Sequence, residues 1–467
     1  MLIAVILPFV SRLSVEESFF TIWMQGSKIG YSSFSTASTT FYGKPADKAS
    51  SRTEISIGLI GANVEMSMSS ETISVKGKPA KMHFVQSSAG RKQVLDAWFE
   101  PAGIRIDVNN NGAKSTQTLP NPKDGTVIDD PVAEFALRPQ PIGTAKVFYV
   151  LDPSTVSLIK NTAKMLGKQD VDIKGVKTSA NAFLIEDTRM NTTVFTGGKG
   201  DVIKVSTSIG SINMDMFPST RAEALEKAES GTQPDVANLT SIKPNVAIHE
   251  PLNLSKLRIK LGADNIPVIP NDTQQGSKKE AGLWTINVQP TQLKTAKTVS
   301  IAVAKSQKPD WVKPSMLIPA TSPRFTKLAK EIIKNKTDVR SAALAIRTYV
   351  HSNMTPNAGI GVLRDASEVL DAKEGVCRDY AILTTSLCRA ANIPARLASG
   401  LVNFEGNFYY HAWVEVWTGY DWLGLDSVPP SDFFTASHVK LSQGNVNQAF
   451  TFTILSKARM EVLEQRN

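Results

Sequence analysis

The spacing of hydrophobic residues changes near Pro323, and this change limits the folds that the chain can adopt. Over residues 16–217, apolar side chains alternate with smaller or polar ones, as in Ile55, Ile57 and Leu59. A period of two buries one face of each strand and leaves the other in water, which is typical of antiparallel sheets. Beyond Pro323, apolar residues recur every three or four positions, which is the period of a helix. The sequence therefore predicts an α+β protein.

Four segments follow from this pattern and from the turn residues within it. We predict a short apolar segment, an antiparallel β-rich domain, a linker with a small β-rich module, and a C-terminal α+β domain, at residues 1–15, 16–230, 231–314 and 315–467. A capping box of Thr220 and Glu223 predicts a helix that runs to about Ser230. In the C-terminal domain we predict helices at 323–336, at 338–353 and from Cys377 onward, and strands at 395–402, 408–417 and 422–426.

The composition and charge exclude several classes of protein. The 467 residues are 42% hydrophobic and 20% charged, which indicates two or three folded domains and not a disordered chain. The net charge is +9, but it is spread out and forms no block of like charges, so no nucleic-acid partner is expected. The apolar run Leu2–Val10 is too short to span a membrane, and no other stretch reaches 18 apolar residues. The protein is therefore not expected to be integral to a membrane.

The two cysteines, Cys377 and Cys388, are predicted to lie on one helix. Eleven residues of helix cover about 16 Å, too far for a disulfide. Gly375 is expected to let the chain turn sharply into this helix. Cys377 would then lie in the first turn, where free N–H groups and a positive partial charge favour a thiolate and can stabilise an oxyanion. The alternative is that Cys377 is a small buried hydrophobic residue, the common fate of a free cysteine. Cys388, deep in the helix, fits that alternative better.

A histidine and an aspartate complete a candidate catalytic group. Alternation in the predicted strand 408–417 places His411, Trp413 and Glu415 on one side. Asp426 ends the next predicted strand, where its carboxylate could accept from one imidazole nitrogen and fix the tautomer. A lone histidine in a strand is more often structural, and the four others lack this setting: His83, His249, His351 and His438.

Three stretches of this region resemble the transglutaminase-like superfamily. They read EGVCRDYAILTTSLCRAANIPARLASG, then YYHAWVEVW, then WLGLDSV, and the resemblance covers roughly residues 322–430. It implies a papain-like α+β core at the C-terminus, with Cys377 as nucleophile, His411 as base and Asp426 as the orienting acid. Trp413 and Trp417 are candidates for the wall of a substrate cleft, with plain strand packing as the alternative. No metal site and no cofactor are expected. Arg396 is expected to pair with Asp379 or Glu415.

The leading functional hypothesis is a cysteine-dependent amidohydrolase that acts on a peptide or protein through a thioester. One alternative is acyl transfer from glutamine to an amine, which is disfavoured because Arg378 stands where the animal crosslinking enzymes carry tryptophan. The other alternative is a non-catalytic envelope protein that uses the same fold for binding or as a scaffold. Residues 2–10 could be the core of a secretory signal, although no positive charge precedes them, or a buried strand. We expect an extracytoplasmic location, while the oligomeric state stays open.

Overall fold

The chain folds into two compact units. The computed structural model describes residues 17–59, 62–129, 131–136, 140–187, 190–209, 212–227, 233–263, 266–360, 363–449, 455 and 457–467. One unit ends at Leu239 and includes the short stretch Gly359–Leu363, and the other consists of Thr240–Ala358 and Arg364–Asn467. The predicted apolar segment at residues 1–15 lies outside the described residues. Among the described helices, none has both the length and the apolar character needed to cross a membrane.

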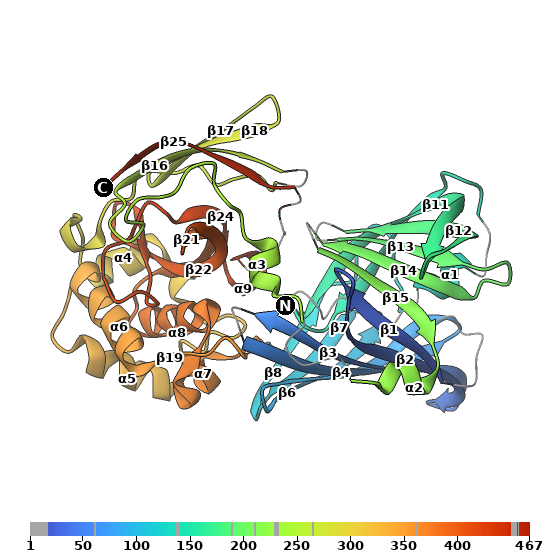
Figure 1. The fold of residues 1–467 in the computed structure, drawn as a ribbon. Coiled ribbons are helices and arrows are strands. Elements are labelled where there is room, and N and C mark those ends of the chain that lie inside the picture. Colours follow the sequence, from blue (N-terminus) through green and yellow to red (C-terminus); the bar gives the residue numbers. More distant parts are fainter. Residues whose placement is uncertain are drawn as a thin grey trace. The chain divides into compact units, whose positions relative to one another are not determined.

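The first unit is built on one long antiparallel sheet, seen as the blue-to-green arrows of Figure 1. The strand order is β8-β7-β6-β5-β4-β3-β2-β1-β15-β14-β13-β12-β11-β10-β9, so β1 and β15 join the two halves. The strands are β1 (Ser18–Met24), β2 (Ser27–Phe41), β3 (Lys44–Leu59), β4 (Ala62–Val75), β5 (Lys78–Ser88), β6 (Arg91–Glu100), β7 (Gly103–Asn110), β8 (Ala113–Leu119), β9 (Thr126–Val127), β10 (Ala145–Asp152), β11 (Ser157–Ile173), β12 (Val176–Glu186), β13 (Asn191–Thr196), β14 (Val202–Ile209) and β15 (Ile212–Ser219).

Alternating burial confirms the predicted β-rich region. Val64, Met66 and Met68 of β4 are buried, while the residues between them are more exposed. Three short helices accompany the sheet: α1 (Pro131–Ala136), α2 (Arg221–Leu225) and α3 (Val236–Thr240). The predicted capping box opens α2, since the Glu223 N–H donates to Thr220 Oγ1 and the Thr220 N–H donates to Glu223 Oε2. The prediction that this helix reaches about Ser230 is wrong, because the backbone leaves the helical conformation at Glu226.

The second unit has three layers, which Figure 1 shows as helices, a sheet and a second sheet. The helical layer contains α5 (Pro323–Ile333), α6 (Val339–Asn353), α7 (Ala366–Ala372) and α8 (Cys377–Ala390). The central sheet has the order β23-β22-β21-β24, from Trp422–Leu425, Asn407–Trp417, Ala395–Phe404 and Val439–Gly444. Helix α8 packs directly against β21 and β22. These helices and strands confirm the predicted α+β domain, with ends that differ by only a few residues.

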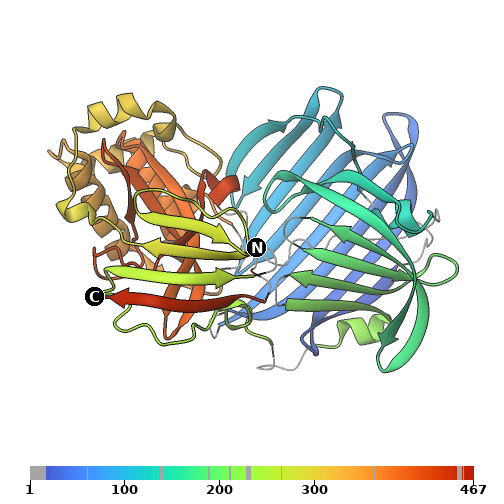
Figure 2. The ribbon, with the colours of Figure 1, turned by 90° about the horizontal axis from the view of Figure 1, so that it is seen from above.

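The second sheet of this unit takes strands from two distant parts of the chain. Its order is β17-β18-β16-β25, from Gln275–Glu280, Leu283–Val288, Lys256–Gly262 and Arg459–Arg466. Figure 2 shows β25, in red, as the edge strand beside the yellow-green β16. Smaller elements complete the unit: η1 (Leu293–Thr295), α4 (Ile301–Gln307), η2 (Pro309–Val312), β19 (Thr355–Pro356), β20 (Glu374–Gly375) and α9 (Val446–Ala449). The β-rich module expected within residues 231–314 therefore includes the C-terminal strand.

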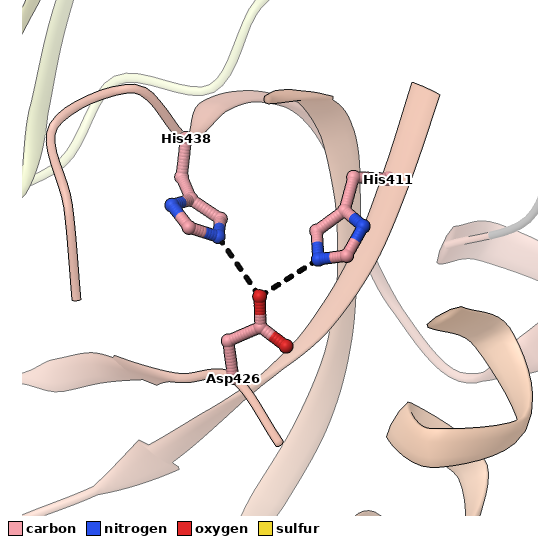
Figure 3. A group of neighbouring side chains, drawn as sticks. All are labelled: His411, Asp426 and His438. Carbon is pink, nitrogen blue, oxygen red and sulfur yellow. Dashed lines mark hydrogen bonds and ion pairs between the residues drawn. The ribbon is translucent and has the colours of Figure 1, made fainter. Parts of the chain in front are cut away.

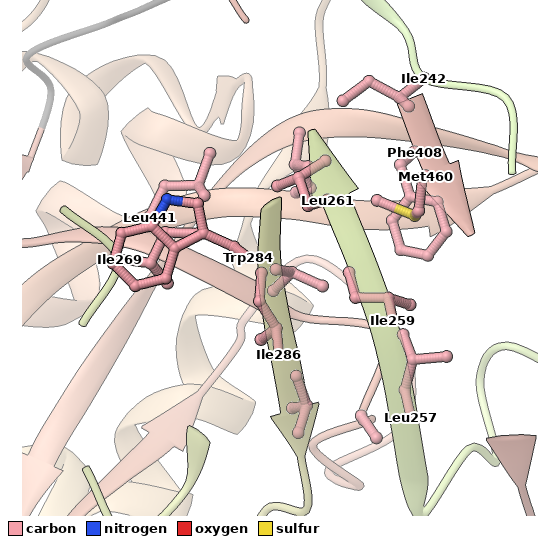
Figure 4. Close-up of a cluster of buried hydrophobic side chains, with 14 of the residues drawn as sticks. Ile242, Leu257, Ile259, Leu261, Ile269, Trp284, Ile286, Phe408, Leu441 and Met460 are labelled. Atoms are coloured by element: carbon pink, nitrogen blue, oxygen red, sulfur yellow. The ribbon is translucent and has the colours of Figure 1, made fainter. Parts of the chain in front are cut away.

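A cluster of buried hydrophobic side chains packs between the two sheets of this unit (Figure 4). Leu257, Ile259 and Leu261 of β16 pack with side chains from the central sheet, among them Phe408. A polar contact supports the same junction, because the side-chain amide of Gln275 both donates to the carbonyl of Lys440, at 2.8 Å, and accepts from its N–H, at 2.7 Å. The module is thus part of the core that supports the central sheet.

Replacing Ile259 with alanine should lower the free energy of unfolding by about 2–5 kcal/mol, because the side chain is fully buried in this cluster and its loss leaves a cavity. Val268→Ala is the control, since Val268 is 85% exposed and its truncation should change stability by less than about 0.5 kcal/mol. Urea unfolding of both variants measures the difference. Equal, small effects would mean that the two sheets do not share one core.

Candidate active site

Helix α8 presents Cys377 in its first turn, as the sequence predicted. The turn is closed by two hydrogen bonds, from the Asp379 N–H to the Val376 carbonyl at 2.8 Å and from the Val376 N–H to Asp379 Oδ2 at 2.9 Å. Asp379 is fully buried and pairs with the fully buried Arg364, whose Nη2 lies 3.0 Å from Oδ2. Arg364 also donates to the carbonyl of Glu374 at 2.5 Å. The segment that leads into Cys377 is therefore anchored on both sides.

Gly375, two residues before Cys377, lies where there is no room for a side chain. Its φ angle is not positive, so the sharp turn that we expected from the sequence is not the reason for a glycine here. A Cβ at Gly375 would lie 2.6 Å from the Asp379 Cβ and 2.7 Å from Arg364 Nη2. Any side chain would push apart the pair that anchors the start of α8.

Strand β22 carries His411, and the end of β23 brings Asp426 beside it. The Nε2 atom of His411 lies 2.7 Å from Asp426 Oδ2. Asp426 is buried, its Oδ1 accepts from the Val428 N–H at 2.9 Å, and its carbonyl accepts from Arg347 Nε at 2.9 Å. This arrangement leaves Nδ1 as the His411 nitrogen that is available to Cys377. The structure thus brings the three predicted catalytic residues together.

The electrostatics of the group favour an ion pair between thiolate and imidazolium. Burial by itself raises the pKa of the Cys377 thiol, but the hydrogen bond and the charge of His411 outweigh it, so the pKa lies below its ordinary value. Burial lowers the pKa of His411, while the charge and hydrogen bond of Asp426 and the contact with Cys377 raise it to about 10. The His411 and His438 side chains overcome the effect of burial on Asp426 and hold its pKa well below the usual range.

A second histidine, His438, reaches the same aspartate. Its Nε2 atom lies 3.1 Å from Asp426 Oδ2, and its Nδ1 atom lies 3.1 Å from the Thr435 carbonyl oxygen. In Figure 3 both dashed lines end on one carboxylate oxygen, between the rings of His411 and His438. The prediction that His438 lacks the setting of His411 is wrong in one respect, because both rings contact Asp426. Nothing in its spacing from Asp426 signals the contact, because it depends on the course of the loop between them.

The two candidate cleft residues lie in different places. Trp413 is buried and stacks on the His411 ring, with centroids 6.3 Å apart and planes at 21°. Trp417 lies six residues beyond His411 along β22, about 20 Å away in an extended strand. There it contacts Trp422, and its Nε1 donates to Gln307 Oε1 at 2.7 Å. The structure therefore places Trp413 beside the candidate catalytic group and does not bring Trp417 to it.

Two other sequence expectations concern the supporting residues. Arg396 pairs with Glu415, at 2.7 Å, and not with Asp379. Glu415 also holds the buried Lys440, which makes a polar connection between β22 and β24. Cys388 is fully buried, and burial raises the pKa of its thiol to about 12, as expected for an inert structural cysteine.

One cluster among the described residues has the donor types and spacing of a metal site. It consists of His411, Asp426 and His438, whose donor atoms lie within 4.8 Å of one another. Two imidazoles and a carboxylate are ligands that zinc accepts. In the structure the same atoms are already hydrogen-bonded to one another, and that network accounts for their closeness.

Iodoacetamide should alkylate Cys377 well below pH ~8.5, the pKa of an ordinary free thiol. The lowered pKa of Cys377 means that the thiolate persists as the pH falls, and the labelling rate drops only once the pH passes below that pKa. On the alkaline side the ion pair is lost as the pH rises through about 10, where His411 gives up its proton. Peptide mass mapping of labelled protein across pH measures the acid-side limit, because the thiolate still alkylates after His411 has lost its proton.

Two controls make this pH dependence specific. In His411→Ala the burial of Cys377 is no longer offset, so the pKa of its thiol should rise and labelling at neutral pH should fall. Cys388 serves as an internal reference in the same sample and should stay unlabelled, because its pKa is about 12 and it is buried. If Cys377 labels with the same pH profile in wild type and His411→Ala, the ion pair does not exist.

Comparison with protein-family models identifies this region. Residues 326–427 match the model of the transglutaminase-like superfamily, so the predicted resemblance is confirmed for the C-terminal domain. An uncharacterised protein of Mycobacterium leprae is 30% identical over 133 residues, which is 26% of this chain and 46% of that protein. The match thus spans less than half the length of that relative.

Comparison with solved structures found two chains that match parts of this one. A candidate cysteine protease from Cytophaga hutchinsonii is 20% identical, with a TM-score of 0.33. The match covers 46% of this chain and 91% of the protease chain. A candidate protease from Parabacteroides distasonis is 12% identical, with a TM-score of 0.22, and covers 73% of this chain and 64% of that one.

Proposed function

We propose that the transglutaminase-like domain of this chain is a cysteine amidohydrolase that cleaves an amide bond of a peptide or protein through a thioester. The observation that carries the proposal is the ordered contact of three side chains: Cys377 with His411, and His411 with Asp426. The lowered pKa of the thiol and the raised pKa of the imidazole are what a nucleophile and its proton carrier require.

The first half of the reaction is acylation. The Cys377 thiolate attacks the amide carbonyl carbon, and the carbonyl oxygen takes up negative charge in a tetrahedral intermediate. The free N–H groups in the first turn of α8 are the donors that we propose stabilise this oxyanion. His411, as imidazolium, then donates its proton to the amide nitrogen, the C–N bond breaks, and the amine leaves. The acyl group stays on Cys377 as a thioester.

The second half is deacylation by water. His411, now neutral, takes a proton from a water molecule whose oxygen attacks the thioester carbonyl. The C–S bond breaks, the carboxylic acid product leaves, and the thiolate–imidazolium pair is restored. Throughout, Asp426 holds His411 Nε2 at 2.7 Å, which keeps Nδ1 directed toward the sulfur and the substrate.

A peptide library with a fluorescent primary amine in excess tests this function, because water and the amine then compete for the same thioester. Mass spectrometry should find new peptide ends that require Cys377, and little amine incorporation at glutamine. Cys377→Ala is the blank for both products. Amine incorporation that exceeds cleavage would favour the crosslinking alternative. Neither product from any peptide would favour a binding or scaffold role.

A further inference from the structure

We infer that His438 is a positioning residue of this site, so that the working group has four members: Cys377, His411, Asp426 and His438. This inference rests on the proposed function. His438 holds the carboxylate of Asp426 in place while His411 gains and loses its proton during the reaction.

The contacts of Asp426 show why a fourth member is needed. Its Oδ1 accepts from the Val428 N–H, and its Oδ2 accepts from His411 at 2.7 Å and from His438 at 3.1 Å. The hydrogen bond from His411 is strong while the ring is an imidazolium and weaker once the ring is neutral. The bond from His438 does not change with that cycle. Asp426 therefore keeps one orientation in both halves of the reaction.

The hydrogen-bond partners of His438 determine which of its nitrogens donate. Nδ1 faces the Thr435 carbonyl oxygen and Nε2 faces the carboxylate of Asp426, each at 3.1 Å. A carboxylate only accepts, so Nε2 is the nitrogen of His438 that donates to Asp426. The ring is buried, with only 2% of its side-chain surface exposed, so water is not an easy substitute for either partner.

Aromatic packing fixes the ring in this position. His438 stacks on Phe434, with centroids 4.3 Å apart, and makes a T-shaped contact with Trp413, with centroids 5.2 Å apart. Trp413 in turn stacks on His411, so one indole aligns both imidazoles. Gly424 in β23 leaves room for Phe434, because a Cβ there would collide with the phenyl ring. The positions of both imidazoles thus depend on side chains packed around one carboxylate.

The experiment is the rate of Cys377 alkylation at neutral pH in His438→Leu and His438→Gln, compared with the wild type. Leucine fills the space without a donor, whereas the glutamine amide can still donate to Asp426 from about the position of Nε2. We expect His438→Leu to lower the rate by at least about tenfold, the scale seen when groups that orient a histidine are removed. His438→Gln should stay within about threefold. His249→Leu, an exposed histidine, should not change the rate.

Two further readouts separate positioning from simple structural support. Thermal unfolding of each variant detects loss of folding, and nitrogen NMR of histidine-labelled protein, assigned with His438→Gln, should find hydrogen on Nε2 of His438, the nitrogen that faces Asp426. Equal rates for folded His438→Leu and wild type, or an Nε2 atom of His438 without hydrogen, would overturn the inference. If wild-type Cys377 is inert at every pH, the proposed function fails instead, and the NMR result still decides whether His438 donates to Asp426.

Discussion

Replacing Cys377 with alanine should reduce Cys377-dependent cleavage by about 10⁴- to 10⁶-fold, the loss seen when the nucleophile of a catalytic triad is removed. The reason is that no other described side chain beside His411 can form the thioester. Folding should be unaffected, since Cys377 is only partly buried and its removal takes away a single sulfur atom. The measurement is the rate of peptide cleavage, with the free energy of unfolding determined on the same samples.

Cys388→Ala is the matched control for this variant. Cys388 is fully buried in the same helix, so its truncation should cost on the order of 1 kcal/mol of stability and leave the cleavage rate unchanged. The two cysteines should thus separate activity from stability. A Cys377→Ala protein that retains cleavage would show that the activity belongs to another site.

Replacing Arg364 with alanine should cost about 3–5 kcal/mol of stability, because it leaves the buried carboxylate of Asp379 without a counter-charge. The same change should slow alkylation of Cys377, since Asp379 and Arg364 anchor the start of α8. Urea unfolding and iodoacetamide labelling measure the two effects. Removing the charge as well, in the double variant Arg364→Ala and Asp379→Asn, should recover part of the stability.

An exposed ion pair of the same domain is the control for Arg364. Arg324 pairs with Asp371, but both side chains are about half exposed to water, and such pairs contribute at most about 1 kcal/mol. Arg324→Ala should therefore be nearly neutral. If Arg364→Ala is as mild as Arg324→Ala, water or another cation compensates Asp379, and the anchoring role assigned to Arg364 is wrong.

Local features of the chain could be predicted because short segments encode them. Alternation in residues 16–217 predicts antiparallel strands, and helical spacing after Pro323 predicts the helices of the C-terminal domain. The start of α8 at Cys377 could also be predicted from local residues. The reason for the glycine at position 375 is the lack of room for a side chain, and not the sharp turn that we expected. His411 and Asp426 could also be predicted, because the strand that carries His411 pairs with the strand that ends at Asp426.

Other features depend on contacts between distant residues, and no local pattern carries them. His438 meets Asp426 only because the loop between them is folded back, with its carbonyl groups at 426, 429, 430 and 431 held by Arg347. Alternation places Trp417 on the same side of the strand as Trp413. However, Trp417 lies four residues further along β22, so it is distant from the site and contacts Trp422 and Gln307 instead.

The sequence by itself determined the fold class, the helix that presents Cys377, and the three candidate catalytic residues. Periodicity, glycine placement and strand neighbours each act over a few residues, so they can be read without knowing the rest of the chain. Only the tertiary structure decided that β25 completes the sheet of β16, that Arg364 neutralises Asp379, and that two histidines share Asp426. Buried charges and core packing are satisfied by whichever residues the fold brings near, and their distance along the chain is arbitrary.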